Sequence, residues 1–235
     1  MGLIIGIEST AHTFSFGAVS SDGSDVLPSS SSLYRPEEGG IHPREAADHH
    51  VHSAGDLLRT AMTSWGANKD DVEAVAFSQG PGLGPCLRVG GSVARSMSMA
   101  LDVPLIGVNH CVAHIEIGRR MTGCVDPILL YVSGGNTQVI ARASGRYRVL
   151  GETLDIGIGN MLDKFGRSIG IPFPGGPEIE RKASTFIQEN GSERLLDLPY
   201  AVHGTDMAFS GILGAAIAHA ERGEDHGLVC HSLQE

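Results

Sequence analysis

Two histidines at an i, i+4 spacing, His110 and His114, are the residues of this sequence whose types and spacing best suit metal chemistry. In a helix, side chains at positions i and i+4 lie on the same face, about one turn apart. Two neutral imidazoles placed in this way can bind one metal ion. The chain holds 11 histidines in 235 residues, so such a pair also arises by chance. The metalloprotease motif with this spacing has a glutamate where this chain has Cys111, so the pair needs support from elsewhere.

A glycine- and proline-rich segment at residues 78–85 lies between an expected strand at 72–77 and an expected helix through 88–101. A strand, glycine loop and helix in this order often bind an anion, because the helix N-terminus offers free N–H groups. A tight packing turn explains the same residues equally well. The segment has no lysine, which excludes a P-loop of the Walker type.

A second group of histidines begins the helix expected at residues 43–65. Pro43 suits the first turn of that helix. His42, on a glycine loop, is a functional candidate, whereas His49 and His52 are expected to lie on a solvated helix start. The buried face of this helix is expected to comprise Ala47, Val51, Ala54, Leu58, Ala61, Met62 and Trp65.

The composition is that of a globular protein, with 41% hydrophobic and 19% charged residues. A net charge of −10 argues against a free-standing nucleic-acid binder, so a nucleic-acid substrate would need a partner that brings positive charge. The four cysteines form no C-x-x-C pair and are predicted to be reduced thiols. The apolar N-terminus predicts a strand and no signal peptide, and no apolar run reaches the 18 residues of a membrane span. We therefore expect a cytoplasmic protein without membrane association.

The strand pattern of the first half of the chain begins again after residue 125. Strands are expected at 3–7, 13–19, 25–30, 72–77 and 104–108, and then at 127–132, 138–143 and 146–150. Both series open with a strand, a short polar turn and a second strand, about 125 residues apart. This repeat predicts two similar α/β lobes, residues 1–125 and 126–235, with a ligand between them.

Helices are expected in the second lobe at about residues 158–169, after Pro177 and at about 210–222, with a further helix starting at 233–235. The expected strands of the second lobe are fewer than those of the first, so the second lobe is predicted to be incomplete. Glu178 and Glu180 are expected in the first turn of the helix that follows Pro177. They either favour the helix dipole or, in the case of Glu180, bind ribose hydroxyls.

Eight motifs in order resemble the universal tRNA threonylcarbamoyladenosine transferases, whose archaeal and eukaryotic members are the catalytic subunit of the KEOPS complex. Two of the motifs are similar to the archaeal and eukaryotic branch in particular. An older name for this family, a glycoprotease, came from its histidine pair. The motifs are GIESTAHT at 6–13, GGIHPREAADHH at 39–50, FSQGPGLGPCLRVG at 77–90, GVNHCVAH at 107–114, YVSGGNTQV at 131–139, ETLDIGIGNMLDKFGR at 152–167, FPGGPEIE at 173–180 and AFSGIL at 208–213.

The resemblance implies an actin-like ATPase fold with two duplicated lobes, and it implies site residues by position. His110, His114 and Tyr131 would be metal ligands. The strand and turn formed by Tyr131, Val132, Ser133, Gly134 and Gly135 would contact threonylcarbamoyl-AMP or nucleotide phosphates. The nucleoside would be contacted by Asp163, Gly176 and Glu180. A later asparagine loop and a metal-binding aspartate of the family have no counterpart in the 235 residues, and Gly166 stands where alanine is more usual.

The implied reaction transfers a threonylcarbamoyl group from threonylcarbamoyl-AMP to N6 of the adenosine at position 37, beside the anticodon of tRNAs that read ANN codons. The implied cofactor is one divalent metal ion per subunit. Mixed nitrogen and oxygen ligands favour iron(II), with zinc as the other choice, over magnesium. The implied partners are tRNA and KEOPS-type subunits, including a small protein kinase. No residue is singled out as a general base.

Three other functions suit parts of the same pattern. A metalloprotease would use the histidine pair but lacks the glutamate at Cys111. A small-molecule kinase or carbamoyl transferase of the same fold would share the hairpins without the NHCVAH and GGIHP motifs. A scaffold that binds a nucleotide without turnover is the third.

Overall fold

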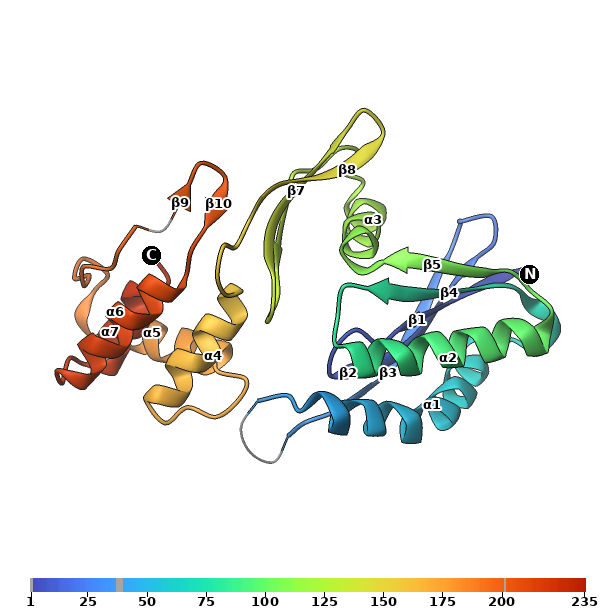
Figure 1. Ribbon diagram of the computed structural model, residues 1–235, viewed down its shortest axis with the longest axis horizontal. Coiled ribbons are helices and arrows are strands. Elements are labelled where there is room, and N and C mark those ends of the chain that lie inside the picture. Colours follow the sequence, from blue (N-terminus) through green and yellow to red (C-terminus); the bar gives the residue numbers. More distant parts are fainter. Residues whose placement is uncertain (1, 37–39, 201) are drawn as a thin grey trace. The chain divides into compact units, whose positions relative to one another are not determined.

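The computed structural model describes residues 2–36, 40–200 and 202–235 (Figure 1). Gly39, the first residue of the 39–50 motif, lies outside the described residues. The contacts between residues divide the chain into two compact units, Met1–Met121 and Thr122–Glu235. Each unit combines helices with a β-sheet, so the predicted α/β class is confirmed.

The first unit is built on a five-stranded sheet with the order β3-β2-β1-β4-β5. Strands β1 (Leu3–Glu8), β2 (Thr13–Ser20) and β3 (Val26–Leu33) form an antiparallel meander. Strands β4 (Val72–Gly80) and β5 (Leu105–Asn109) then add parallel to β1 on its other side. The carboxyl ends of β1, β4 and β5 therefore meet at one edge of the sheet.

Two helices, α1 (Pro43–Trp65) and α2 (Gly84–Leu101), cover one face of this sheet (Figure 1). Burial alternates along β1 and β2, which places Ile5, Ile7, Phe14 and Phe16 against the helices. Helix α1 begins with proline in its first turn and ends at Gly66, whose φ of 62° is left-handed and suits glycine. Val51 is the exception to the predicted buried face of α1, because 60% of it is exposed beside α2.

Helix α3 (His110–Thr122) directly follows β5 and carries the histidine pair. The side chain of Asn109 accepts hydrogen bonds from the backbone N–H groups of Cys111 at 3.0 Å and Val112 at 3.2 Å. These bonds satisfy donors that a helix N-terminus otherwise leaves without partners. Asn109 thereby fixes where α3 starts, and so places His110 in its first turn. The short 3-10 helix η1 (Lys69–Asp71) precedes β4.

The second unit opens with the same antiparallel meander, made of β6 (Leu129–Val132), β7 (Thr137–Ala143) and β8 (Arg146–Glu152). The turn between β7 and β8 uses Ser144 and Gly145, whose φ values of 53° and 74° are both left-handed. Two successive residues with positive φ are typical of a tight β-hairpin. The predicted repeat of the meander is confirmed, and it agrees with the duplicated lobes that the family resemblance implies.

Four helices complete the described part of the second unit: α4 (Ile158–Ser168), α5 (Gly176–Asn190), α6 (Ser210–Glu221) and α7 (His226–Ser232). Phe165, Ile179, Ala183, Ala216 and Val229 form their common core. The expected helix at 233–235 is wrong, because α7 begins earlier and ends at Ser232. A short hairpin of β9 (Val202–His203) and β10 (Asp206–Met207) is absent from the sequence prediction.

None of the helices within the described residues combines the length and the apolar character that crossing a bilayer requires. The four cysteines are free thiols, of which Cys86, Cys111 and Cys230 are buried and Cys124 is exposed.

Candidate functional site

The histidine pair lies where three neighbouring parallel strands of the first unit end. Glu8 is the last residue of β1, Ser78 lies near the end of β4, and His110 follows β5 directly. In open α/β sheets, ligands bind outside the carboxyl ends of parallel strands. The position of the pair in the sheet therefore favours a binding site.

The two imidazoles present their Nε2 atoms to each other at 3.3 Å. The ring centroids are 4.6 Å apart and the ring planes lie at 88°. Two nitrogen ligands that each lie about 2.0–2.1 Å from a tetrahedral metal ion are separated by about 3.3 Å. The pair therefore has the separation that a shared metal ion requires.

A carboxylate holds the other side of the first imidazole. Glu8 Oε2 lies 3.0 Å from His110 Nδ1 and also accepts a hydrogen bond from the Ser78 hydroxyl. Glu8 Oε1 accepts a 2.6 Å hydrogen bond from the backbone N–H of Thr10, whose hydroxyl lies 3.5 Å from His110 Nδ1. Residues from β1, the turn after it, β4 and α3 thus form one hydrogen-bonded network.

The charges of this network suit a cation. Burial by itself would raise the pKa of Glu8, but hydrogen bonds from His110, Ser78 and Thr10 lower this pKa to about 2. His114 is largely exposed, but partial burial of its ring and the neighbouring His110 lower its pKa, which favours the neutral imidazole that binds metals. An anionic carboxylate behind one imidazole and a neutral second imidazole fit a divalent metal ion.

Within the described residues, no group of three or more His, Cys, Asp and Glu side chains has the arrangement of a metal site. The histidine pair thus offers two nitrogen ligands, and further ligands would have to be of another kind. Tyr131, the predicted third ligand, belongs to the second unit, in β6, where it is 9% exposed and pairs with Gln138 of β7.

Neither Cys111 nor Glu8 lies where the general base of a metalloprotease would lie. Cys111, which replaces the motif's glutamate, is buried, and burial raises the pKa of its thiol. Glu8 contacts His110 at Nδ1, whereas the two Nε2 atoms face each other on the far side of that ring. This geometry disfavours proteolysis at the pair.

The glycine-rich loop before α2 packs against the turn that follows β1. A Cβ at Gly82 would lie 2.5 Å from the backbone oxygen of Thr10, and one at Gly90 would lie 1.9 Å from Ser9 Oγ. Leu83 N donates a 2.7 Å hydrogen bond to Thr10 O. Of the two interpretations of this loop, the packing turn is the one that these contacts favour, and the loop holds the Glu8–Thr10 turn in place.

In the second unit, the predicted loop of Ser133, Gly134 and Gly135 packs on the start of α4. Gly159 N and Asn160 N donate hydrogen bonds to Ser133 O at 3.2 Å and Gly134 O at 2.9 Å. A Cβ at Gly157 would lie 2.7 Å from Gly134 O, and one at Gly159 would lie 2.8 Å from Gly134 Cα. Close approach of two backbones therefore shapes this loop, and Gly134 and Gly135 remain exposed beside it.

The other predicted residues of the second unit lie on α4 and α5. Asp163 Oδ1 accepts a 2.8 Å hydrogen bond from Gly175 N, immediately before α5. Gly176 is the first residue of α5, and Glu180 is exposed one turn further along. Because α4 also supports the 133–135 loop, the structure brings the loop, Asp163 and Gly176 to the same two helices. Val132 precedes the loop and is 51% exposed.

His42, His49 and His52, near the start of α1, have their described partners outside the Glu8–His110 network. His42 is exposed near Glu45. His52 is exposed, as predicted, and its Nδ1 lies 2.7 Å from Asp48 O. The prediction is wrong for His49, which is half-buried with its Nε2 2.9 Å from the Ser32 hydroxyl of β3.

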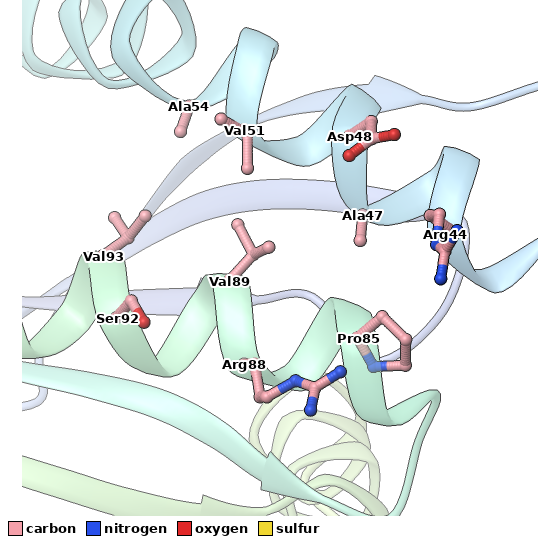
Figure 2. Close-up of a pocket in the computed structure, with 10 residues that line it drawn as sticks. All are labelled: Arg44, Ala47, Asp48, Val51, Ala54, Pro85, Arg88, Val89, Ser92 and Val93. Carbon is pink, nitrogen blue, oxygen red and sulfur yellow. The ribbon is translucent and has the colours of Figure 1, made fainter.

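A groove of about 520 Å³ lies between α1 and α2 (Figure 2). Apolar side chains such as Val51, Val89 and Val93 form its walls, and Arg44, Asp48 and Arg88 lie around them. None of the predicted site residues lines this groove.

Glu8 and Ser78 are not among the site residues that the sequence predicts. The signal that could have identified them is their position, because each lies at the carboxyl end of a buried strand. That signal becomes informative only when β1, β4 and β5 are known to be parallel neighbours.

Comparison with known proteins gives a consistent result. The family model described as tRNA N6-adenosine threonylcarbamoyltransferase (TsaD) matches residues 26–235. A tRNA N6-adenosine threonylcarbamoyltransferase of Methanopyrus kandleri is 52% identical over 239 residues, which cover 99% of this chain and 67% of the relative. A "Probable bifunctional tRNA threonylcarbamoyladenosine biosynthesis protein" of Thermoplasma volcanium is also 52% identical, over 233 residues.

The match to the Thermoplasma relative covers 99% of this chain but only 43% of the relative, so this chain spans less than half of the relative's length. Among solved structures, YeaZ from Pseudomonas aeruginosa matches with a TM-score of 0.46 and 14% identity, over 97% of this chain and 98% of that chain. The family model covers most of the chain, and the identity to the Methanopyrus transferase is high over two thirds of that protein. The chain therefore belongs to the tRNA N6-adenosine threonylcarbamoyltransferase family.

Proposed function

We propose that this chain carries the threonylcarbamoyl-transfer site of a tRNA-modifying enzyme. The reaction takes the threonylcarbamoyl group from threonylcarbamoyl-AMP and places it on N6 of adenosine 37 in tRNAs that read ANN codons. The N6 amine forms a bond to the carbamoyl carbon, the bond from that carbon to the phosphate oxygen breaks, AMP leaves, and N6 loses a proton. The observation that carries the proposal is the histidine pair with its Nε2 atoms 3.3 Å apart, in a chain of this family.

The proposed cofactor is one divalent metal ion. His110 and His114 supply two nitrogen ligands, and we assign Tyr131 as a third, oxygen ligand. Mixed nitrogen and oxygen ligands favour iron(II), with zinc as the other choice. When bound, the ion would supply Lewis-acid polarisation of an oxygen of the substrate.

The role of the second unit is to bind the adenylate. The exposed residues Val132, Gly134 and Gly135 leave room for backbone N–H groups to contact the phosphate and the acyl group. Ser133 donates its hydroxyl hydrogen to Asn136 O at 2.9 Å, which shapes the loop. Asp163, Gly176 and Glu180 on α4 and α5 would contact the nucleoside.

The net charge of −10 bears on the partners. A protein that binds tRNA by itself normally presents a basic surface to the phosphates. We therefore propose that KEOPS-type subunits, including a small protein kinase, supply much of the positive charge that tRNA requires. The proposed location is the cytoplasm.

The test is a transfer assay with the purified full-length protein, tRNA, threonylcarbamoyl-AMP and iron(II), with and without KEOPS-type partner subunits. The modified nucleoside is measured by mass spectrometry after digestion of the tRNA. We expect modification by the parent protein and a loss on the order of 100-fold or more in His114→Ala. His52→Ala is the matched control, because His52 is an exposed histidine of α1 outside the network.

Each other result has a defined meaning. Unchanged modification by His114→Ala would contradict the metal role of the pair. Binding of the adenylate without modification, in the parent protein with all partners present, would favour a nucleotide-binding scaffold. Peptide cleavage that persists in His110→Ala would place any proteolysis at another site.

A further inference from the structure

We propose that Glu8 is the positioning residue of the histidine pair: it accepts the Nδ1 proton of His110 and thereby directs the Nε2 lone pair of His110 toward the metal. This inference rests on the metal role proposed above. It adds a residue from another strand to the site and assigns a different proton position to each histidine.

Glu8 acts as an acceptor at the atom it contacts, because an ionised carboxylate only accepts hydrogen bonds. Glu8 Oε2 lies 3.0 Å from His110 Nδ1, so the proton between them belongs to His110. A neutral imidazole carries one proton, and with that proton on Nδ1 its Nε2 can only accept a hydrogen bond or bind a metal ion.

Hydrogen bonds hold both carboxylate oxygens of Glu8. Oε1 accepts from Thr10 N at 2.6 Å, and Oε2 accepts from the Ser78 hydroxyl in addition to His110. Thr10 is held in turn by Leu83 N, and Gly82 allows the two loops to approach. The turn after β1 and strand β4 therefore hold the carboxylate independently of its contact with His110.

The proton position of His110 also determines that of His114. If His110 is neutral with its proton on Nδ1, the 3.3 Å contact between the two Nε2 atoms requires that His114 donates its Nε2 proton when no metal is bound. If both Nε2 atoms held a metal ion, the neutral His114 would carry its proton on Nδ1. His110 thus keeps one tautomer throughout, whereas His114 changes tautomer when the metal binds.

A carboxylate that accepts the second ring proton of a histidine ligand fixes the tautomer and raises the basicity of the ligand. Loss of such a partner typically weakens metal binding by about 10- to 100-fold. We expect Glu8→Ala to weaken zinc binding by a factor in this range. Glu8→Gln keeps an acceptor but can also donate to Nδ1, so we expect a smaller loss and a mixture of His110 tautomers.

The experiment is nitrogen NMR of the full chain with labelled histidines, assigned with His110→Gln and His114→Gln, before and after addition of zinc alone. Zinc affinity is measured by titration calorimetry on the same samples. Glu73→Gln is the matched control, because Glu73 is an exposed glutamate of β4. We expect Nδ1–H on His110 in both states, Nε2–H on His114 only without zinc, and unchanged zinc affinity in the control.

A metal-free parent protein with Nε2–H on His110 would overturn the proposal, and this result needs no variant to fold. Zinc affinity and tautomers unchanged in folded Glu8→Ala would also overturn it. If zinc does not bind the parent protein at the pair, the metal role fails. In that case, the tautomer of His110 in the metal-free protein still tests whether Glu8 accepts its Nδ1 proton.

Discussion

The candidate sites of the two units are held in place by different kinds of contact. In the first unit, side chains of Glu8, Ser78 and His110 come from three elements and position one another by hydrogen bonds. In the second unit, the loop at 133–135 is positioned by backbone packed on backbone at Gly157 and Gly159. The first site suits a cation that needs directed lone pairs. The second suits an anion that needs exposed N–H groups.

This difference predicts how each site fails. Removal of one side chain from the network of the first unit changes the set of metal-binding groups without moving the sheet that carries them. A methyl group added at the backbone contact must move the loop itself, so function and stability change together.

His114→Ala should weaken zinc binding by more than the roughly 10- to 100-fold that loss of an outer-shell partner causes, because one of two nitrogen ligands is itself lost. The free energy of unfolding of the metal-free protein should change by less than about 1 kcal/mol, since the side chain lies at an exposed position. Calorimetric titration with zinc and denaturant unfolding of the same samples measure the two effects. A large loss of stability with unchanged affinity would reverse the contrast.

Gly157→Ala should lower the free energy of unfolding by about 1–3 kcal/mol, because its Cβ would lie 2.7 Å from backbone atoms of the 134–136 loop. Binding of the adenylate to the proposed site should weaken in parallel. Gly214→Ala is the matched control: its Cβ meets no atom within 4 Å in α6. There, alanine should be neutral or stabilise by up to about 1 kcal/mol. Equal effects at the two glycines would contradict the role of close packing.

Asp163→Ala should cost about 1–2 kcal/mol, because the N–H of Gly175 loses the acceptor that it has at 2.8 Å. It should also weaken adenylate binding, whereas zinc affinity should stay unchanged if the two functions are separate. Asp197→Ala serves as a control for loss of a carboxylate in the same unit. Urea unfolding and titrations with a non-hydrolysable adenylate analogue distinguish these effects.

Asp155 gives the smallest and most pH-dependent effect. Its carboxylate accepts hydrogen bonds from the N–H groups of Phe209 and Ser210 at the start of α6. Burial would raise its pKa, but these bonds and one from Ile156 lower the pKa from 3.8 to about 2. A pKa that is lower in the folded state stabilises the protein above the unfolded value and loses this effect as pH falls toward 2.

Asp155→Ala should therefore cost about 1 kcal/mol at neutral pH, a value that allows for the solvent exposure of this carboxylate. The difference from the parent protein should shrink as the pH falls from about 4 to about 2. Unfolding curves across this range measure it, and a difference that is constant with pH would contradict the assignment.

Much of the fold could be predicted because the hydrophobic pattern is regular. The apolar run at 3–7, the strand expected at 13–19 and the repeat of the meander after residue 125 each gave the correct element. The hairpin at 202–207 was not predictable, because two-residue strands are too short to show periodicity. Val51 lies on the expected helical face yet is exposed, since helical spacing does not say how far the neighbouring helix extends.

The candidate site was predictable only in part. The histidine spacing and the glycine loops are local signals. The contact between Glu8 and His110 joins residues 102 positions apart and depends on the parallel order of β1, β4 and β5. Glu8 also lies in a polar segment that a hairpin turn explains fully. Its role becomes apparent only from the sheet topology.

The most direct measurement is the anomalous scattering of a zinc-soaked crystal of the full chain. We expect one peak about 2.0–2.1 Å from both His110 Nε2 and His114 Nε2, with Glu8 still at His110 Nδ1. A peak at Nδ1 of either histidine, or no peak at the pair when zinc is bound elsewhere, would contradict it.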